Sequence, residues 1–331
     1  MNNKGLFPPL TQNYAQQERL VGFEIEFAGL TIQDSTKLLQ QLYSGTIQVH
    51  NAQQWSLVNS KLGTFNIELD AQFLKNLARK SNENMKQEKI DIEGYLGKTI
   101  SYVLQNVVPL EIITPPVAIS QIEALNPIID ELRKNKAKDT HASLLAAFGL
   151  HINPDVPKLD STTILSYLQA YILLNDWLRE VIKVDLTRHI SPYIDEYPEG
   201  YALEILNPSY KPSLSGLIDD YLSYNTSRNR SLDMLPLFAY IDEKKVRSRV
   251  NFTLIKPRPT FHYRLPNTNL GSESWDLIVE WKRWNTVEKL AANEGLRIQL
   301  SDAYLKQKQN KSLFMQTNTW LNYITPYVKE L

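Results

Sequence analysis

Apolar and polar side chains alternate in two segments of the chain, and both segments carry acidic residues. In residues 21–29 (VGFEIEFAG), Glu24 and Glu26 occupy one face, and the opposite face is apolar: Phe23, Ile25 and Phe27. Residues 63–70 (GTFNIELD) repeat the pattern, with Glu68 and Asp70 on the polar face. A period of two is typical of a β-strand that buries one face. We therefore predict two strands whose acidic faces point away from the core.

The rest of the chain predicts short strands grouped between helices. Further strands are expected at residues 46–50, 55–59, 107–114 and 143–153, and strand signals at 250–265 are broken by Pro257 and Pro259. Helical spacing covers residues 34–43, with Asp34 as cap, and residues 71–106, 120–135, 161–184 and 213–224. Two or three further helices are expected after Trp275. Residues 185–212 look irregular. Strands and helices do not alternate regularly, which favours an α+β fold with a mainly antiparallel sheet over a doubly wound parallel one.

Composition and charge exclude several classes of function. Lysine plus arginine and aspartate plus glutamate number 36 each in 331 residues, and a net charge of zero argues against nucleic acid or a membrane as a partner bound by bulk charge. The absence of cysteine excludes disulfides and thiolate nucleophiles and fits a reducing compartment. Residues 1–19 form a polar leader without a signal-peptide pattern, and no window is apolar enough to span a membrane. A soluble, cytoplasmic protein is expected.

The acidic strands predict a metal site. Residues two apart on a strand lie about 6.6 Å apart on one face, so Glu24 and Glu26 repel each other unless a cation lies between them. A single such pair more often belongs to a solvated strand face. The pattern recurs, however, at residues 63–70, and Glu111 lies in a third, apolar run (VVPLEIITPP), where burial without a partner is costly. Carboxylates from several strands are the ligands that magnesium requires.

Histidine and arginine residues extend this cluster. In GLHIN, His151 faces away from the apolar side of its strand; alone it would more often be structural, but beside an acidic cleft it is a candidate ligand for metal or phosphate. Between Lys244 and Arg264 there are seven basic residues and no acidic one. Residues 244–249 are interpreted as a solvated basic turn. Arg264 lies between apolar neighbours in FHYRLP and shares a face with His262, and a guanidinium fork suits phosphate oxygens.

Acidic groups in residues 24–111 and basic groups in residues 228–264 together meet the needs of phosphoryl transfer, in which catalysis is mostly positioning and charge neutralisation. Four motifs in this order, GFEIEFAGL, LEIITPP, GLHIN and FHYRLP, resemble those of the bacterial amidoligase family. That family is similar to the glutamate–cysteine ligase branch of the glutamine synthetase-like carboxylate–amine ligases. The resemblance spans roughly residues 20–266.

This resemblance implies a glutamine synthetase-like fold, with a curved, mainly antiparallel sheet and helices packed on its outer face. It also implies ATP and two or three divalent ions, Mg²⁺ or Mn²⁺. Metal ligands would come from the acidic strands: Glu24, Glu26 and Glu111, with Glu68 and Asp70 matching the amidoligase pattern alone. His151 would lie near the metal that bridges the ATP phosphates. Arg264 would stabilise the transferred γ-phosphoryl group, and Arg228 is expected from its position to contact phosphate or the substrate carboxylate.

One residue departs from the family motif. The closing motif of the family has Glu where this chain has His262. Imidazole binds magnesium poorly but manganese or zinc well. The last metal site is therefore expected to be altered, lost or shifted in its metal preference.

The expected activity is ATP- and Mg-dependent joining of a carboxylate to an amine through an acyl phosphate, with a small-molecule or peptide substrate. Three alternatives stay open: a metal-dependent hydrolase or nuclease, a guanidino-kinase-like phosphotransferase, and a scaffold of the same fold that has lost the chemistry. The expected parts are the leader (1–19), a catalytic domain (20–266) and C-terminal helices packed on the same domain (267–331). The aromatic residues of the last part are interpreted as packing, with a homo-oligomer or pathway-partner surface as the alternative.

Overall fold

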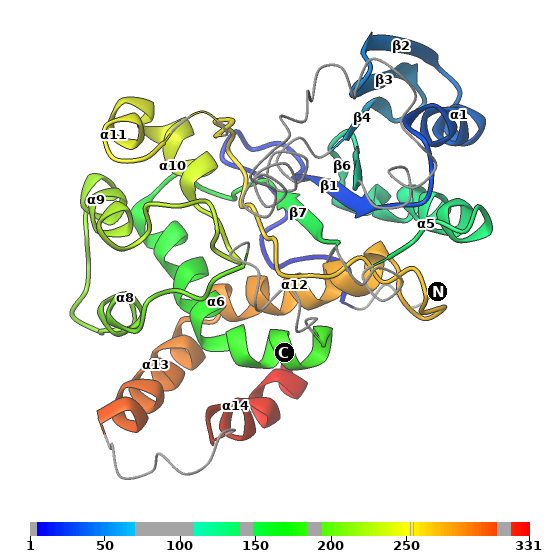
Figure 1. Ribbon diagram of the computed structural model, residues 1–331. Helices are drawn as coiled ribbons and strands as arrows, with labels where there is room; N and C mark the ends of the chain where they lie inside the picture. Colours follow the sequence, from blue (N-terminus) through cyan, green and yellow to red (C-terminus); the bar gives the residue numbers. More distant parts are fainter. Residues whose placement is uncertain are drawn as a thin grey trace, which may run out of the picture.

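A computed structural model describes residues 5–69, 109–139, 148–183, 194–251, 253, 255–309 and 319–331. This part of the chain is α+β (Figure 1). Seven strands form one sheet in the order β2-β3-β4-β5-β1-β6, and β7 also pairs with β1. Their bounds are Leu20–Phe27 (β1), Thr46–Asn51 (β2), Gln54–Ser60 (β3), Gly63–Leu69 (β4), Leu110–Ile113 (β5), Val117–Ala118 (β6) and Leu150–Pro154 (β7). The pairings are antiparallel, as predicted.

The register of the central strands separates an apolar face from an acidic one. Ile25 of β1 lies opposite Ile112 of β5, which lies opposite Ile67 of β4, and the three side chains are fully buried. Along β1, buried and partly exposed residues alternate without a break. The alternation predicted for β1 and β4 is therefore confirmed. Asp70 lies outside the described residues.

Helices cover the apolar face and extend the molecule on one side. The helical elements are Ile32–Tyr43 (α1), Ile119–Leu125 (η1, a 3₁₀ helix), Asn126–Lys134 (α5), Ser161–Ile182 (α6), Glu199–Ile205 (α8), Leu214–Tyr224 (α9), Leu235–Ile241 (α10), Glu243–Arg247 (α11), Leu277–Ala292 (α12), Glu294–Gln309 (α13) and Thr319–Glu330 (α14). Helix α1 packs on β2, β3 and β4, and α12 packs on α6 and η1. Figure 1 shows α8 to α11 gathered on the far side of α6 from α1 and α5. The helices predicted at 161–184 and 213–224 and after Trp275 are confirmed.

Two predicted helix features are wrong in detail. Thr31, not Asp34, caps α1, because the Thr31 hydroxyl accepts the backbone N–H of Asp34 at 3.0 Å. Asp34 is the third helical residue, a position that suits a carboxylate. The helix predicted at 120–135 is divided into η1 and α5, and α5 starts with Pro127 in its first turn, where proline fits best.

Three predictions for the second half of the chain need correction. Residues 185–212 contain α8, which buries a short apolar face, where we expected irregular structure. Residues 244–249 overlap the short helix α11, not a turn. The described residues of 250–265 form isolated bridges but no ladder. Prolines 257 and 259 lack the amide hydrogens that a ladder needs. His262 and Arg264 lie on a segment that is held beside β7 by backbone hydrogen bonds of Phe261, Tyr263 and Pro266.

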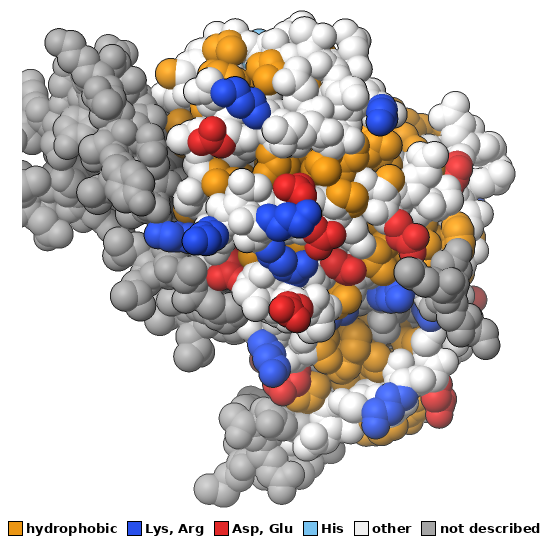
Figure 2. All heavy atoms as spheres, turned by 90° about the vertical axis from the view of Figure 1, so that its right-hand side faces the viewer, with side chains coloured by type: hydrophobic (Ala, Val, Ile, Leu, Met, Phe, Trp, Pro, Cys, Tyr) orange, Lys and Arg blue, Asp and Glu red, His pale blue; other side chains and the backbone are white. Residues whose placement is uncertain are grey.

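The N-terminal segment packs on α12. Trp281 donates its indole N–H to the carbonyl of Leu6 at 2.6 Å, and Arg19 forms a fully buried ion pair with Glu288. The division into leader, catalytic domain and C-terminal helices stays a prediction. Among the described helices, none has the length and hydropathy that a membrane span needs. Figure 2 shows basic and acidic side chains interspersed on one face, as the zero net charge leads one to expect.

Candidate functional site

Three carboxylates lie in a row across neighbouring strands. Glu26 of β1 is opposite Glu111 of β5, and Glu111 is opposite Glu68 of β4. The side chains of Glu26 and Glu111 are 23% and 22% exposed, so they are reachable from solvent but lack the full hydration of a surface carboxylate. The row lies on the face opposite the buried isoleucines. Antiparallel pairing thus turns an alternating sequence pattern into one acidic surface.

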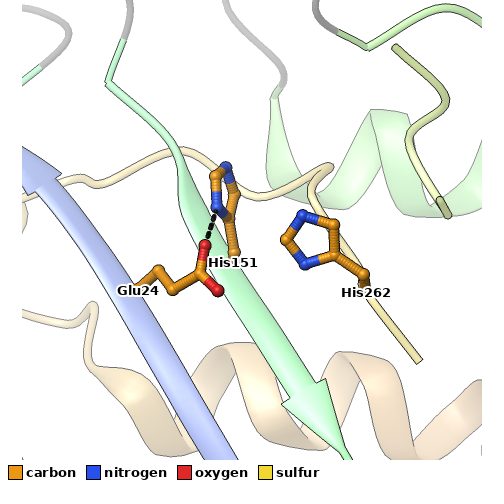
Figure 3. A group of neighbouring side chains, drawn as sticks. All are labelled: Glu24, His151 and His262. Atoms are coloured by element: carbon orange, nitrogen blue, oxygen red, sulfur yellow. Dashed lines mark hydrogen bonds and ion pairs between the residues drawn. The ribbon is translucent and has the colours of Figure 1, made fainter. Parts of the chain in front are cut away.

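His151 lies at the centre of the acidic groups. Strand β7 pairs with β1 so that His151 is directly opposite Glu24. Its Nδ1 is 2.7 Å from Glu24 Oε2 and 3.8 Å from Glu111 Oε1, and its Nε2 is 3.4 Å from Glu26 Oε1. Figure 3 shows Glu24, His151 and His262 coming together from three separate segments of the chain. The predicted convergence of Glu24, Glu26, Glu111 and His151 is therefore present.

Glu24 stays ionised because positive groups and donors surround it. Burial opposes ionisation, but the hydrogen bond with His151 and the neighbouring His262 and Arg258 hold the pKa of Glu24 well below its usual value. Asn153 donates to Glu24 Oε1 at 3.0 Å, and Arg258 Nη2 lies 3.6 Å from the same oxygen. The two oxygens have different neighbours, since Oε2 faces His151. A buried carboxylate is thus kept negative.

His262 is buried against the same network. The residue is 1% exposed, and its Nδ1 lies 2.8 Å from Asn153 Oδ1 and 3.0 Å from Arg258 Nη2. Burial lowers the pKa of His262 well below the usual value, and the Arg258 charge acts in the same direction. The imidazole is therefore neutral near pH 7 and keeps a lone pair on one ring nitrogen.

The arginines form a second cluster around a buried aspartate. Asp233 is fully buried, and its Oδ2 lies 3.5 Å from Arg228 Nε. Arg264 donates to the backbone carbonyl of Arg228. Burial lowers the pKa of Arg264, whereas Asp233 and, through space, Glu26 and Glu24 raise it. Arg228 and Arg264 therefore lie together, and Arg264 lies within electrostatic reach of Glu24 and Glu26.

Among the described residues, two groups of side chains could hold a metal ion. Glu24, His151 and His262 form one group, and Glu26, Glu111 and His151 form the other, with the ligand atoms of each group within 4.8 Å of one another. The second group offers two carboxylates, which fit a hard divalent cation such as Mg²⁺. Glu68 belongs to neither group; Gln54 donates to its Oε1 at 2.9 Å.

Sequence reasoning missed three residues of this site. Asn153 lies two residues after His151, so the period of two that placed His151 could have found it. Arg258 lay within the basic stretch, but nothing in that stretch marked it as the residue that reaches Glu24. Asp233 follows a loop and carries no periodic signal.

Comparison with known proteins gives one match. A family model described as "Putative amidoligase enzyme" matches residues 17–286, most of the chain and every site residue described above. No curated protein and no solved structure matches the chain. The glutamine synthetase-like fold and the glutamate–cysteine ligase branch accordingly stay predictions.

Proposed function

Since the chain belongs to the amidoligase family, we propose that it is an ATP-dependent ligase that joins a carboxylate to an amine. One observation carries the proposal. Carboxylates of β1 and β5 lie beside His151, and Arg264 is close enough for the charges of Glu26 and Glu24 to raise its pKa. Phosphoryl transfer to a carboxylate brings several negative oxygens together. Such a reaction needs fixed positive groups beside a metal site, and Arg264 and the carboxylates of this cluster are the residues that would provide them.

In the proposed reaction, a carboxylate oxygen of the substrate attacks the γ-phosphorus of ATP. The bond from that phosphorus to the bridging oxygen breaks, and ADP leaves with the electron pair. The product is an acyl phosphate. An amine then attacks the acyl carbon, inorganic phosphate leaves, and the amine nitrogen loses a proton to give the amide. The substrate carboxylate is proposed to belong to an amino acid or a peptide.

The side chains of the site have separate roles in these steps. Arg264 and Arg228 would orient the phosphate oxygens and stabilise the charge that develops on them. Glu26 and Glu111, with His151, would hold a divalent cation, which when bound screens the negative charges of phosphate and carboxylate. Asp233 would keep the guanidinium of Arg228 in place, because it is a fixed, buried charge at 3.5 Å.

The test is ADP release by the purified protein with Mg²⁺ or Mn²⁺ and a panel of amino acids, peptides and polyamines. We expect ADP only when a carboxylate and an amine are both present. The variants Glu26→Gln and Arg264→Lys should lower kcat about 10²- to 10³-fold, the usual cost of removing a group that stabilises transition-state charge. Glu131→Gln is the matched control, because Glu131 pairs with Lys134 on α5, in neither ligand group. If no substrate pair releases ADP, the proposal is abandoned.

The products separate this function from its rivals. A phosphorylated guanidino compound without an amide would identify a phosphotransferase, and turnover without ATP would identify a hydrolase. A scaffold would bind its partner equally well after Glu24→Ala and Glu26→Ala. Formation of an amide with stoichiometric ADP and phosphate is the result that we expect.

A further inference from the structure

The two ligand groups share His151 but differ in chemistry. We call Glu24, His151 and His262 the nitrogen-rich group, because two of its three ligands are imidazoles. We call Glu26, Glu111 and His151 the oxygen-rich group. Magnesium requires oxygen ligands and gives up its water reluctantly, whereas imidazole suits zinc, cobalt and nickel. The two groups therefore favour different metals.

His262 has one ring nitrogen that the described part of the chain leaves without a partner. Its Nε2 is buried and makes no hydrogen bond with any described residue. A buried polar atom without a partner is costly, so native proteins rarely contain one without a ligand, water or ion beside it. The His262 ring points toward Glu24 and His151 (Figure 3). The unpartnered atom is thus an observation that points to a ligand independently of the clustering.

The side chain of Asn153 favours a proton on Nδ1 of His262. Its Nδ2 donates to Glu24 Oε1 at 3.0 Å, so its Oδ1 faces the other way. That oxygen accepts from Arg258 Nη2 at 2.9 Å and lies 2.8 Å from His262 Nδ1. Arg258 Nη2 lies 3.0 Å from the same Nδ1 and can only donate, so Nδ1 lies between a donor and an acceptor. With the proton on Nδ1, which the Asn153 oxygen favours, Nε2 carries the lone pair that binds a metal.

We propose that Glu24, His151 and His262 bind a divalent transition metal of the zinc class, and that Mg²⁺ is then held by Glu26 and Glu111 without His151, because a neutral imidazole has a single lone pair. The inference rests on the same site as the proposed function and adds its metal selectivity. Asn153 is a positioning residue, since it contacts both Glu24 and His262.

The experiment uses the full chain, stripped of metal with a chelator, in excess Mg²⁺ and without ATP or substrates. Zn²⁺ is titrated by calorimetry, and Co²⁺ by the visible absorption that its nitrogen and oxygen ligands produce. We expect one tight Zn²⁺ site per chain. His262→Glu and Asn153→Ala should each weaken Zn²⁺ binding roughly 10- to 100-fold, the usual cost of changing a ligand or its supporting partner.

Two controls separate this site from others. His50→Gln tests nonspecific binding, because His50 lies on the exposed strand β2, bonded to Ser56 and outside both groups. This variant should bind Zn²⁺ as wild type does. Glu111→Gln changes the oxygen-rich group only, so it should keep the Co²⁺ spectrum and lose Mg²⁺ affinity. Thermal melts show whether each variant folds. If His262→Glu does not fold, Asn153→Ala still tests the inference, because it leaves the ligands intact.

Wild-type protein that binds Zn²⁺ no more tightly than His262→Glu would overturn the inference, as would loss of the Co²⁺ spectrum in His50→Gln. The proposed function fails in a different way. If ADP forms with Mg²⁺ alone and no Zn²⁺ is bound, the metal inference is wrong and the ligase proposal stands. If Zn²⁺ binds as expected and no substrate pair releases ADP, the ligase proposal is wrong and the metal inference stands.

Discussion

Glu280 makes the stability of the protein depend on pH in a direction opposite to that of most carboxylates. It lies on α12 and is 1% exposed. Its Oε1 accepts from Trp275 Nε1 at 2.8 Å and from Arg283, while its Oε2 has no hydrogen-bond partner among the described residues. Burial raises the pKa of Glu280 from 4.5 to about 7, and Arg283 and Trp275 offset only part of the effect. The perturbation that tests this is Glu280→Gln.

The magnitude follows from the pKa. One pKa unit corresponds to about 1.4 kcal/mol, so the rise from 4.5 to about 7 makes ionised Glu280 cost about 3 kcal/mol in the folded state. Between these two pH values the folded chain binds more protons at this site than the unfolded chain does. The free energy of unfolding therefore falls as pH rises from 4.5 to 7, and this contribution is gone above pH 7. Glutamine cannot ionise, so the variant does not lose this stability.

Urea unfolding of wild type and Glu280→Gln at pH 5 and pH 8 measures the effect. We expect the variant to gain roughly 2 to 3 kcal/mol relative to wild type between the two pH values. Glu131→Gln, which changes an exposed pair on α5, should keep the pH dependence of wild type. A stability difference between Glu280→Gln and wild type that is equal at pH 5 and pH 8 would refute the reasoning.

Two further predictions concern the buried charges. Arg19→Met should destabilise the fold by about 3 to 5 kcal/mol, because Glu288 would keep a fully buried charge without its bidentate partner; urea unfolding measures it, and adding Glu288→Gln should restore part of the loss. Asp233→Asn should lower kcat/KM for ATP roughly 10- to 100-fold, because Arg228 loses its fixed charge and small displacements in a site are costly. Asp233→Glu should recover some of that activity, and an Asp233→Asn variant with unchanged kinetics would contradict the positioning role.

Local periodicity was enough to predict the acidic strands. The alternation around Glu24 and Glu26 determines which side chains share a face, because successive residues of a strand point to opposite sides. The same rule correctly separated His151 from its apolar neighbours. Strand β7 and the helix α6 also follow from their own residues. These features depend on residues that lie close together in the sequence, and the periodic spacing of apolar and polar side chains marks them.

Only the tertiary structure decided how these pieces meet. The row of Glu26, Glu111 and Glu68 depends on the register of three strands, and His151 reaches Glu24 because β7 pairs with β1 and not with another strand. Arg258 and Asp233 come from segments without a period, so no local pattern marks them. Arg258 is positioned by hydrogen bonds to Asn153 of β7 and to the carbonyl of Pro236 in α10, and Asp233 by a hydrogen bond to the carbonyl of His262. A sequence specifies which face a side chain takes along its own strand, but the neighbours on that face come from the strands that pack beside it.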